Sequence, residues 1–191
     1  MQSRDKEAEA TIRNLLQWIG DDPDREGLKD TPKRVVARYK KIFSGYRADL
    51  KSILNKPTIP VEKEMGMFVV PKIKFISFCE HPLLPMIGEV DVAYIPKKKL
   101  AGLGTVVKLV NVFTRRLQLQ EKLTEQIAEA IKKYLEPKGV AIAVTAKHYC
   151  VDRETTGSLS EELITYNFSD CFKIDKQTQN QFLIAINKSN T

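Results

Sequence analysis

The stretch Phe78-Cys79-Glu80-His81-Pro82-Leu83-Leu84-Pro85 separates two β-rich segments and carries a thiol and an imidazole two residues apart. A second such pairing, Lys147-His148-Tyr149-Cys150-Val151, follows later in the chain. A thiolate and an imidazole are ligands that zinc prefers, and the two histidines of the chain each lie two residues from a cysteine. Two interpretations stand: a metal site assembled from two distant strands, or coincidence, because neither spacing is that of a standard zinc motif.

The composition is that of a soluble globular protein. The 191 residues are 42% apolar and 29% charged, and they permit one domain with an N-terminal helical extension. No run approaches the roughly 18 apolar residues that span a bilayer, so we expect no membrane segment. Three cysteines without a disulfide framework, and a start without an apolar signal segment, favour a cytoplasmic location. Cys171, with no histidine near it, is interpreted as structural.

The net charge of +7 leaves three explanations open: nucleic acid, an anionic small molecule, or solubility alone. We do not expect nucleic acid as a partner, because no basic stretch is interleaved with aromatic residues. The run Lys97-Lys98-Lys99 follows Pro96 as a turn would, which favours a solvated hairpin tip.

The hydrophobic periodicity predicts an α+β chain in which helices flank pairs of strands. Predicted helices cover residues 3–20, 31–45 and 175–186, and residues 105–135 form either one bent helix or two consecutive ones. Predicted strands cover residues 67–70, 72–79, 89–95, 140–146 and 163–172. Ser3, Thr31 and Asp175 are the expected N-caps. We expect residues 1–50 to form an N-terminal helical region and residues 51–191 one compact domain.

Further stretches follow in a fixed order around the two Cys–His pairings. They are Leu84-Pro85, Gly88, Val92-Ala93-Tyr94-Ile95-Pro96, Gly102-Leu103, Arg115-Arg116-Leu117-Gln118, Gln120-Glu121 and Leu123-Thr124-Glu125-Gln126-Ile127-Ala128. With Cys79-Glu80-His81 and His148-Tyr149-Cys150-Val151, they resemble the GTP cyclohydrolase I family. The likeness runs from the helix entry at Asp22–Tyr39 to Phe182-Leu183, and a match of that extent is far more specific than a short motif.

The resemblance implies a tunnelling fold, in which a four-stranded antiparallel sheet carries two helices on one face. It implies that subunits close into a ring of five and that two rings stack as a homodecamer. It also implies an activity, the hydrolytic opening of the GTP imidazole ring with release of formate and re-closure to 7,8-dihydroneopterin triphosphate.

The resemblance also assigns roles to individual residues. It implies zinc held by Cys79 and Cys150, which would supply hydroxide to the ring carbon between the two imidazole nitrogens. His81 and His148 match histidines that move protons. The Glu121 carboxylate, reinforced by Gln120, matches the grip on the guanine edge. Arg34 matches an arginine that faces the triphosphate. Without the resemblance, Gln120-Glu121 would be interpreted as an exposed helical turn and Arg34 as a surface charge.

Several positions depart from the family pattern. Pro82 stands where a histidine is the third protein ligand of the zinc, and proline cannot bind the metal. Gly104-Thr105 replaces a Ser-Lys pair that faces the sugar and phosphates. Lys108 stands where an arginine is usual, and Glu154 stands where another follows, although Arg153 is adjacent. The departures cluster on recognition of the triphosphate, for which Lys108 and Arg153 remain the candidate cations.

Three hypotheses therefore remain. The chain is an active GTP cyclohydrolase I with a remodelled site, a family member acting on another purine-like substrate without a triphosphate, or a non-catalytic ring-forming paralogue. We favour the first, because both cysteines, both histidines and Gln120-Glu121 persist.

Overall fold

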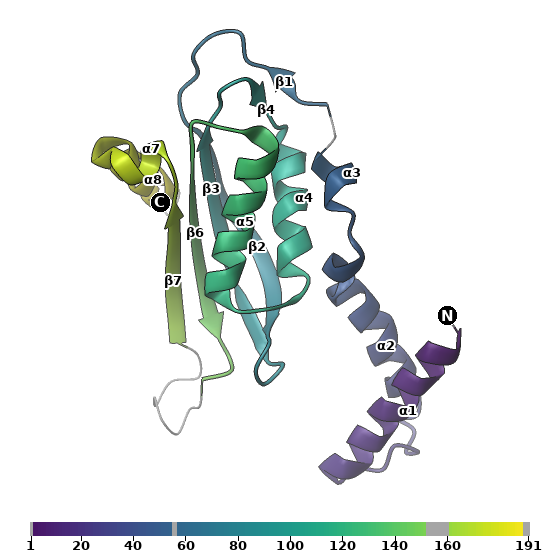
Figure 1. The fold of residues 1–191 in the computed structure, drawn as a ribbon. Coiled ribbons are helices and arrows are strands. Elements are labelled where there is room, and N and C mark those ends of the chain that lie inside the picture. The colour runs from purple at the N-terminus through teal and green to yellow at the C-terminus, as the bar shows by residue number, and fades with distance from the viewer. Residues whose placement is uncertain (1, 55–56, 152–160, 189–191) are drawn as a thin grey trace. The chain divides into compact units, whose positions relative to one another are not determined.

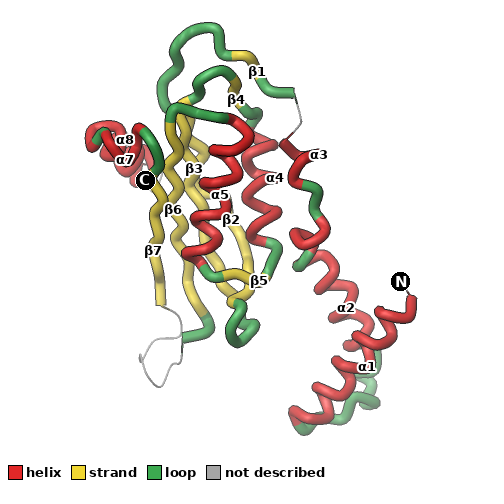
Figure 2. Tube along the Cα trace, in the orientation of Figure 1, coloured by secondary structure: helices red, strands yellow, loops and turns green. Residues whose placement is uncertain are grey.

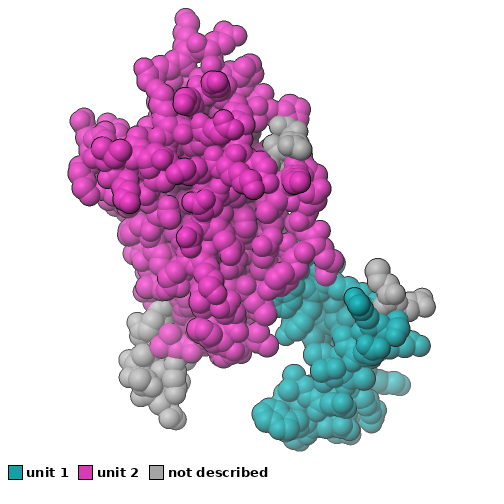
Figure 3. Space-filling view, in the orientation of Figure 1, with its two compact units in different colours: residues 1–44 teal, residues 45–191 magenta. Residues whose placement is uncertain are grey.

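The computed structural model describes residues 2–54, 57–151 and 161–188. Contacts divide the chain into two compact units, Met1–Ser44 and Gly45–Thr191, which Figure 3 colours teal and magenta. None of the helices that the structure describes is long and apolar enough to cross a membrane.

The first unit is a pair of helices, α1 (Gln2–Ile19) and α2 (Thr31–Ile42). Lys40 of α2 forms an ion pair with Asp5 of α1. Two predicted caps are wrong. Ser3 lies inside α1, where its hydroxyl donates to Glu7 one turn on, and Asp30 rather than Thr31 is the N-cap of α2. Pro32 is therefore the second helical residue rather than the first, and it still fits the first turn because it has no N–H to satisfy there.

The second unit is built on a sheet whose strand order is β5-β2-β3-β6-β7 (Figures 1 and 2). Its long strands are β2 (Phe68–Cys79), β3 (Pro85–Ile95), β6 (Gly139–His148) and β7 (Glu161–Phe168), and each is antiparallel to its long neighbour. The short β5 (Leu117–Gln118) adds a parallel edge beside β2. The predicted purely antiparallel, four-stranded sheet is therefore corrected to a mixed, five-stranded one.

Two helices cover one face of this sheet, α4 (Leu103–Thr114) and α5 (Gln120–Leu135). The sequence left one bent helix or two open, and the structure has two, separated by β5. Their apolar residues and alternate residues of β3 and β6, among them Val90, Val92 and Ile142, form the main core. The remaining short elements are a 3-10 turn (Ser44–Arg47), α3 (Leu50–Leu54) and the ribbon of β1 (Ile59–Pro60) with β4 (Lys99–Leu100).

The C-terminal helices α7 (Cys171–Ile174) and α8 (Lys176–Lys188) cover part of the opposite face. Phe172 and Phe182 are fully buried there against alanines of β3 and β6. The prediction of helices on one face alone is therefore wrong for this chain. The predicted strand at 163–172 is also too long, because β7 ends at Phe168 and Asp170 then turns the chain with a φ of 50°.

Candidate functional site

The two Cys–His segments meet at one end of the sheet. Strands β2 and β6 are both antiparallel to β3, which lies between them, so they run in the same direction and end at the same edge of the sheet. Cys79 is the last residue of β2, and His148 is the last residue of β6. Tyr149 N donates to the Pro85 carbonyl over 3.2 Å, and this bond ties the second segment to the turn that follows Cys79.

Both thiols are free, and they lie close enough to interact. Cys79 is buried, with 5% of its surface exposed, and Cys150 is half-buried. Burial, and then a hydrogen bond to the Cys79 thiol, raise the pKa of the Cys150 thiol above its ordinary value. Cys150 Sγ also lies 3.8 Å from His148 Nδ1. The structure thus brings together Cys79, Cys150 and His148.

Gln120, the first residue of α5, is fully buried beside His148. Its amide oxygen lies 2.7 Å from His148 Nε2. Its amide nitrogen donates to the carbonyls of Val144 and Leu163, each over 2.9 Å, and is 3.2 Å from the Thr165 hydroxyl. The amide therefore connects α5 to both β6 and β7.

Glu121 is exposed in the first turn of α5. Burial lowers the pKa of His148, and the charge of Glu121 opposes that shift in part. Lys122, next on the helix, forms an ion pair of 3.0 Å with Glu80. This pair joins α5 to the turn at 80–84, in which His81 and Pro82 are exposed. Because Glu121 is exposed and its charge acts on His148, its carboxylate can contact a ligand near the His148 ring.

The remaining predicted positions that the structure describes lie on α2 and α4. Arg34 belongs to the first unit, where it is exposed and pairs with Asp30 over 3.5 Å. Lys108 is exposed on α4. Gly104 is the second residue of the same helix, and a Cβ added there would meet nothing within 4 Å. The predictions for Arg153 and Glu154 fall on residues outside those that the structure describes.

A complete metal-binding set is absent from the described part of the chain, where no group of three or more His, Cys, Asp or Glu is arranged to hold an ion. The two thiols fit part of a zinc site, and Pro82 occupies the turn where a third donor would be expected. The residues present therefore match two of the three protein ligands that catalytic zinc normally has.

Thr124 and Thr165 belong to the site, although the sequence analysis gave neither a role. Thr124 Oγ1 donates to the Gln120 carbonyl over 2.8 Å and lies 2.6 Å from Thr165 Oγ1. Thr124 is one turn after Gln120 on α5, a spacing at which a threonine hydroxyl can reach the backbone. The bond from Thr124 to the Gln120 backbone carbonyl was therefore predictable from the sequence. Thr165 lies far along the chain, so its contact with Thr124 could be predicted only by knowing that β6 pairs with β7.

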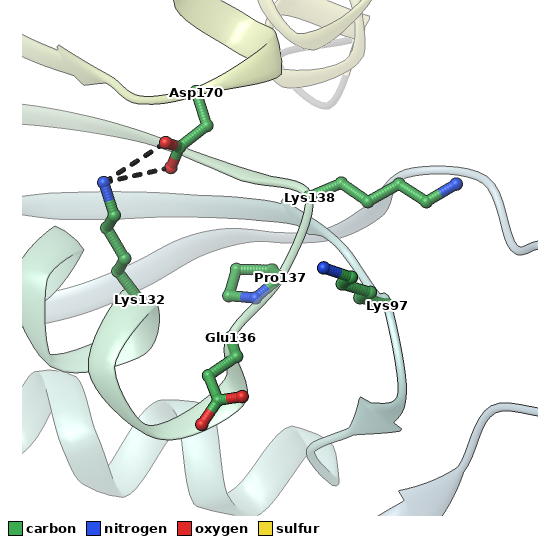
Figure 4. Close-up of a pocket in the computed structure, with 6 residues that line it drawn as sticks. All are labelled: Lys97, Lys132, Glu136, Pro137, Lys138 and Asp170. Atoms are coloured by element: carbon green, nitrogen blue, oxygen red, sulfur yellow. Dashed lines mark hydrogen bonds and ion pairs between the residues drawn. The ribbon is translucent and has the colours of Figure 1, made fainter.

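A separate surface pocket of about 490 Å³ lies at the other end of the strands (Figure 4), where Ile95 pairs with Gly139. It is lined by Lys97, Lys132, Glu136, Pro137, Lys138 and Asp170. Lys132 is paired with Asp170 over 3.2 Å, and Lys138 is paired with Glu64. The pocket contains neither cysteine nor histidine, so it is distinct from the thiol–imidazole cluster.

Comparison with known proteins gives near full-length matches. The sequence pattern of the GTP cyclohydrolase I family matches residues 8–187. The GTP cyclohydrolase 1 of Campylobacter curvus is 42% identical over 179 residues, which cover 94% of each chain. That of Bartonella quintana is 39% identical over 184 residues, 96% of this chain and 89% of that one. Among solved structures, the apo archaeosine synthase QueF-Like covers 55% of this chain and 96% of its own at 22% identity, with a TM-score of 0.45.

Proposed function

Since the chain belongs to the GTP cyclohydrolase I family and is therefore a hydrolase, we propose that it opens the imidazole ring of GTP by hydrolysis. Formate leaves, and the product re-closes to 7,8-dihydroneopterin triphosphate. The observation that carries the proposal is the cluster of Cys79, Cys150 and His148 beside the first turn of α5. Together with the exposed carboxylate of Glu121, this cluster places a thiol pair and an imidazole that can transfer protons at one end of the sheet.

Zinc is the metal we propose for this site, held by Cys79 and Cys150. When bound, zinc lowers the pKa of a coordinated water toward neutrality and so supplies a hydroxide nucleophile. Because Pro82 cannot serve as a ligand, binding by two thiolates alone is weaker than in a three-ligand site. His81, which is exposed in the turn beside Pro82, is our candidate for the third donor.

The other side chains act on protons and on the guanine ring. His148 transfers a proton to a nitrogen of the imidazole ring that is opened, since an imidazole can both accept and donate near neutral pH. His81 serves as a second proton carrier when it is not bound to the metal. The Glu121 carboxylate accepts hydrogen bonds from the guanine N–H and the exocyclic amine, a pairing that suits an acceptor-only group. Its exposure in the first turn of α5 supports this role.

Arg34, Lys108 and Arg153 are the cations that we propose for the triphosphate. Each charge-assisted contact to a phosphate oxygen contributes about 1.5 to 3 kcal/mol, so two or three of them would give a strong preference for GTP over guanosine. The departures at Gly104-Thr105 and Glu154 act in the opposite direction, because they remove a hydroxyl and an ammonium and add a negative charge.

We further propose that the subunits adopt the tunnelling fold and close into rings, which form a decamer of two pentamers. An edge strand of the sheet supports this proposal. Strand β7 ends the sheet, and Leu163, Ile164 and Tyr166 on it are between 39% and 49% exposed. An apolar edge strand is prone to pair with another chain, and ring closure removes such edges.

The decisive experiment is a formate and pterin-fluorescence assay on zinc-reconstituted protein with GTP, GMP and guanosine at one salt concentration. We expect formate release from GTP and a steep preference for it in binding titrations. Glu121→Gln should lose activity on GTP while keeping its zinc. Formate from a substrate without phosphates would favour the alternative purine-like substrate. No formate from any of the three, with equal affinities, would favour a non-catalytic paralogue.

A further inference from the structure

We infer that Gln120 is a positioning residue that holds the neutral His148 ring in the tautomer with its proton on Nε2, so that His148 exchanges protons with the substrate through Nδ1. The inference deepens the proposed function and rests on it for the catalytic consequence. The tautomer itself follows from the hydrogen bonds of the buried amide.

The orientation of the Gln120 amide is fixed by its two backbone neighbours. One end of the amide faces the carbonyl oxygens of Val144 and Leu163, each at 2.9 Å. Carbonyl oxygens only accept hydrogen bonds, so the NH₂ group must lie at that end. A flipped amide would place three acceptor oxygens together in a fully buried position, and such unmet acceptors are costly. The amide oxygen therefore points at His148.

The proton on His148 follows from that orientation. The amide oxygen of Gln120 is an acceptor without a hydrogen, and it lies 2.7 Å from His148 Nε2. Nε2 must then be the donor and carry the proton. In a neutral imidazole the other nitrogen has the free lone pair. That nitrogen, Nδ1, is the one 3.8 Å from Cys150 Sγ and hence turned toward the thiol pair.

Two threonine hydroxyls complete the hydrogen-bond network, and each of them has one possible role, as donor or acceptor, in each contact. Thr124 donates its single hydroxyl proton to the backbone carbonyl of Gln120. In its 2.6 Å contact with Thr165, the Thr124 hydroxyl must therefore be the acceptor. Thr165 then donates to Thr124, and its oxygen is available to the Gln120 amide nitrogen at 3.2 Å. Every polar atom of the Gln120 side chain has a partner within the chain. A satisfied buried network of this kind is rigid, which suits a group that orients another.

The same contacts argue against a direct hold on substrate by the Gln120 side chain. Its surface is fully buried, and its donors and acceptor are engaged by β6, β7 and His148. Glu121, the next residue, is exposed and remains the guanine contact. The pair thus divides the work: Glu121 binds the substrate, and Gln120 sets the ring that transfers the proton.

The test is ¹⁵N NMR of protein labelled at histidine, as purified and with its metal content measured. The chain has two histidines, so a His81→Asn sample assigns the signals. We expect a protonated-type shift at Nε2 of His148 and an unprotonated-type shift at Nδ1. Protonation of Nδ1 in the neutral ring, or an equal mixture of the two forms, would overturn the inference. This readout needs no activity, so a failure of the GTP assay alone would refute the proposed function and leave the tautomer standing.

Gln120→Met removes the acceptor while keeping the length of the side chain. We expect the Nε2–H preference to weaken and kcat on GTP to fall by about 10- to 100-fold with KM little changed, by analogy with the loss of a partner that orients a metal-ligating histidine. Gln118→Met is the matched control. Gln118 is also buried, with 3% of its surface exposed, and its amide donates to the Phe113 carbonyl (2.9 Å) and to Gln126 (3.0 Å) rather than to a histidine.

The control should keep the native tautomer, and thermal unfolding of both variants measures their structural cost. A raised KM with unchanged kcat in Gln120→Met would show that the amide touches the substrate instead and would refute the inference. Equal effects of both variants on the tautomer would also refute it. If Gln120→Met does not fold, the ¹⁵N spectrum of the native protein alone tests the inferred tautomer.

Discussion

At the scale of single residues, the two thiols carry the metal hypothesis. Cys79 and Cys150 interact at the ends of adjoining segments, whereas Cys171 lies on the other face of the sheet beside Gly139. We predict that Cys150→Ser abolishes zinc binding, because a neutral hydroxyl is a poor substitute for a thiolate. Elemental analysis after zinc reconstitution measures the effect. Cys171→Ser is the matched control and should retain its zinc. Unchanged stoichiometry in Cys150→Ser would refute the site.

Pro82 provides the complementary gain-of-function test. Pro82→His should tighten zinc binding by about tenfold or more, which corresponds to about 1.4 kcal/mol, because it restores a donor in the turn after Cys79. Competition with a chelator gives the affinity. Leu83→His is the control: it puts an imidazole one position further on, at a φ of 59° that histidine tolerates better than most residues. Equal affinity in Pro82→His and the native protein would remove the argument about the missing ligand.

Asp91 gives a pH-dependent prediction. The residue is 8% exposed, and its carboxylate accepts from Lys72 N over 2.9 Å, at the β2 bulge where Lys72 has a φ of 53°. Burial, together with the charge of Glu89, raises the pKa of Asp91 above 3.8, although the Lys72 N–H opposes this. The folded state then binds more protons than the unfolded one between the two pKa values, so this group destabilises the protein as pH rises through that window.

Asp91→Asn keeps the acceptor for Lys72 and removes the charge. We expect the variant to be more stable than the native protein at about pH 7, and the difference to shrink as pH falls toward about 4. Urea unfolding at both pH values measures this. Asp175→Asn should show the opposite trend, because hydrogen bonds from Thr178 and Gln177 lower the pKa of Asp175. A pH-independent difference for Asp91→Asn would contradict the assignment.

At the scale of elements, α8 depends on its cap. Asp175 accepts from Gln177 N (2.9 Å) and from the Thr178 hydroxyl (2.5 Å), which confirms its predicted role. Asp175→Ala should lower the unfolding free energy, because it removes the N-cap of α8, the helix that holds the buried Phe182. Chemical unfolding measures it. Glu129→Ala, an exposed change on α5, should stay within about 0.5 kcal/mol. Equal costs would show that the cap is not the cause.

The elements that the sequence predicted are those with long periodic patterns. The helix pairs and the strands that end at Cys79, Ile95 and Phe168 carry enough alternation or helical spacing to be recognised. The two-residue β5 and the four-residue α7 are too short to show any period. For the site, the Cys–His pairings were visible in the sequence. The bond from Gln120 to His148 was not, because it depends on packing α5 against β6, which no local pattern specifies.

At the scale of the whole molecule, the exposed apolar surface indicates further assembly. Strand β7 is an open edge of the sheet with exposed Ile164, and α1 carries Trp18 with 82% of its surface exposed. Exposed apolar groups gathered on a sheet edge or one helix mark interaction surfaces more often than isolated ones do. The occupant that we propose for this surface is a second copy of the chain.

We therefore predict that light scattering at micromolar concentration gives a mass several times 21.7 kDa, and ten times for the proposed decamer. Ile164→Lys should lower that mass, because a lysine on an edge strand opposes pairing with another strand. Ile87→Lys is the control: it is 41% exposed on β3, which is paired on both sides, and should leave the mass unchanged. Trp18 is the single tryptophan, so its emission reports whether α1 becomes covered. A native mass of one chain would contradict assembly, and with it any site completed by a neighbouring subunit.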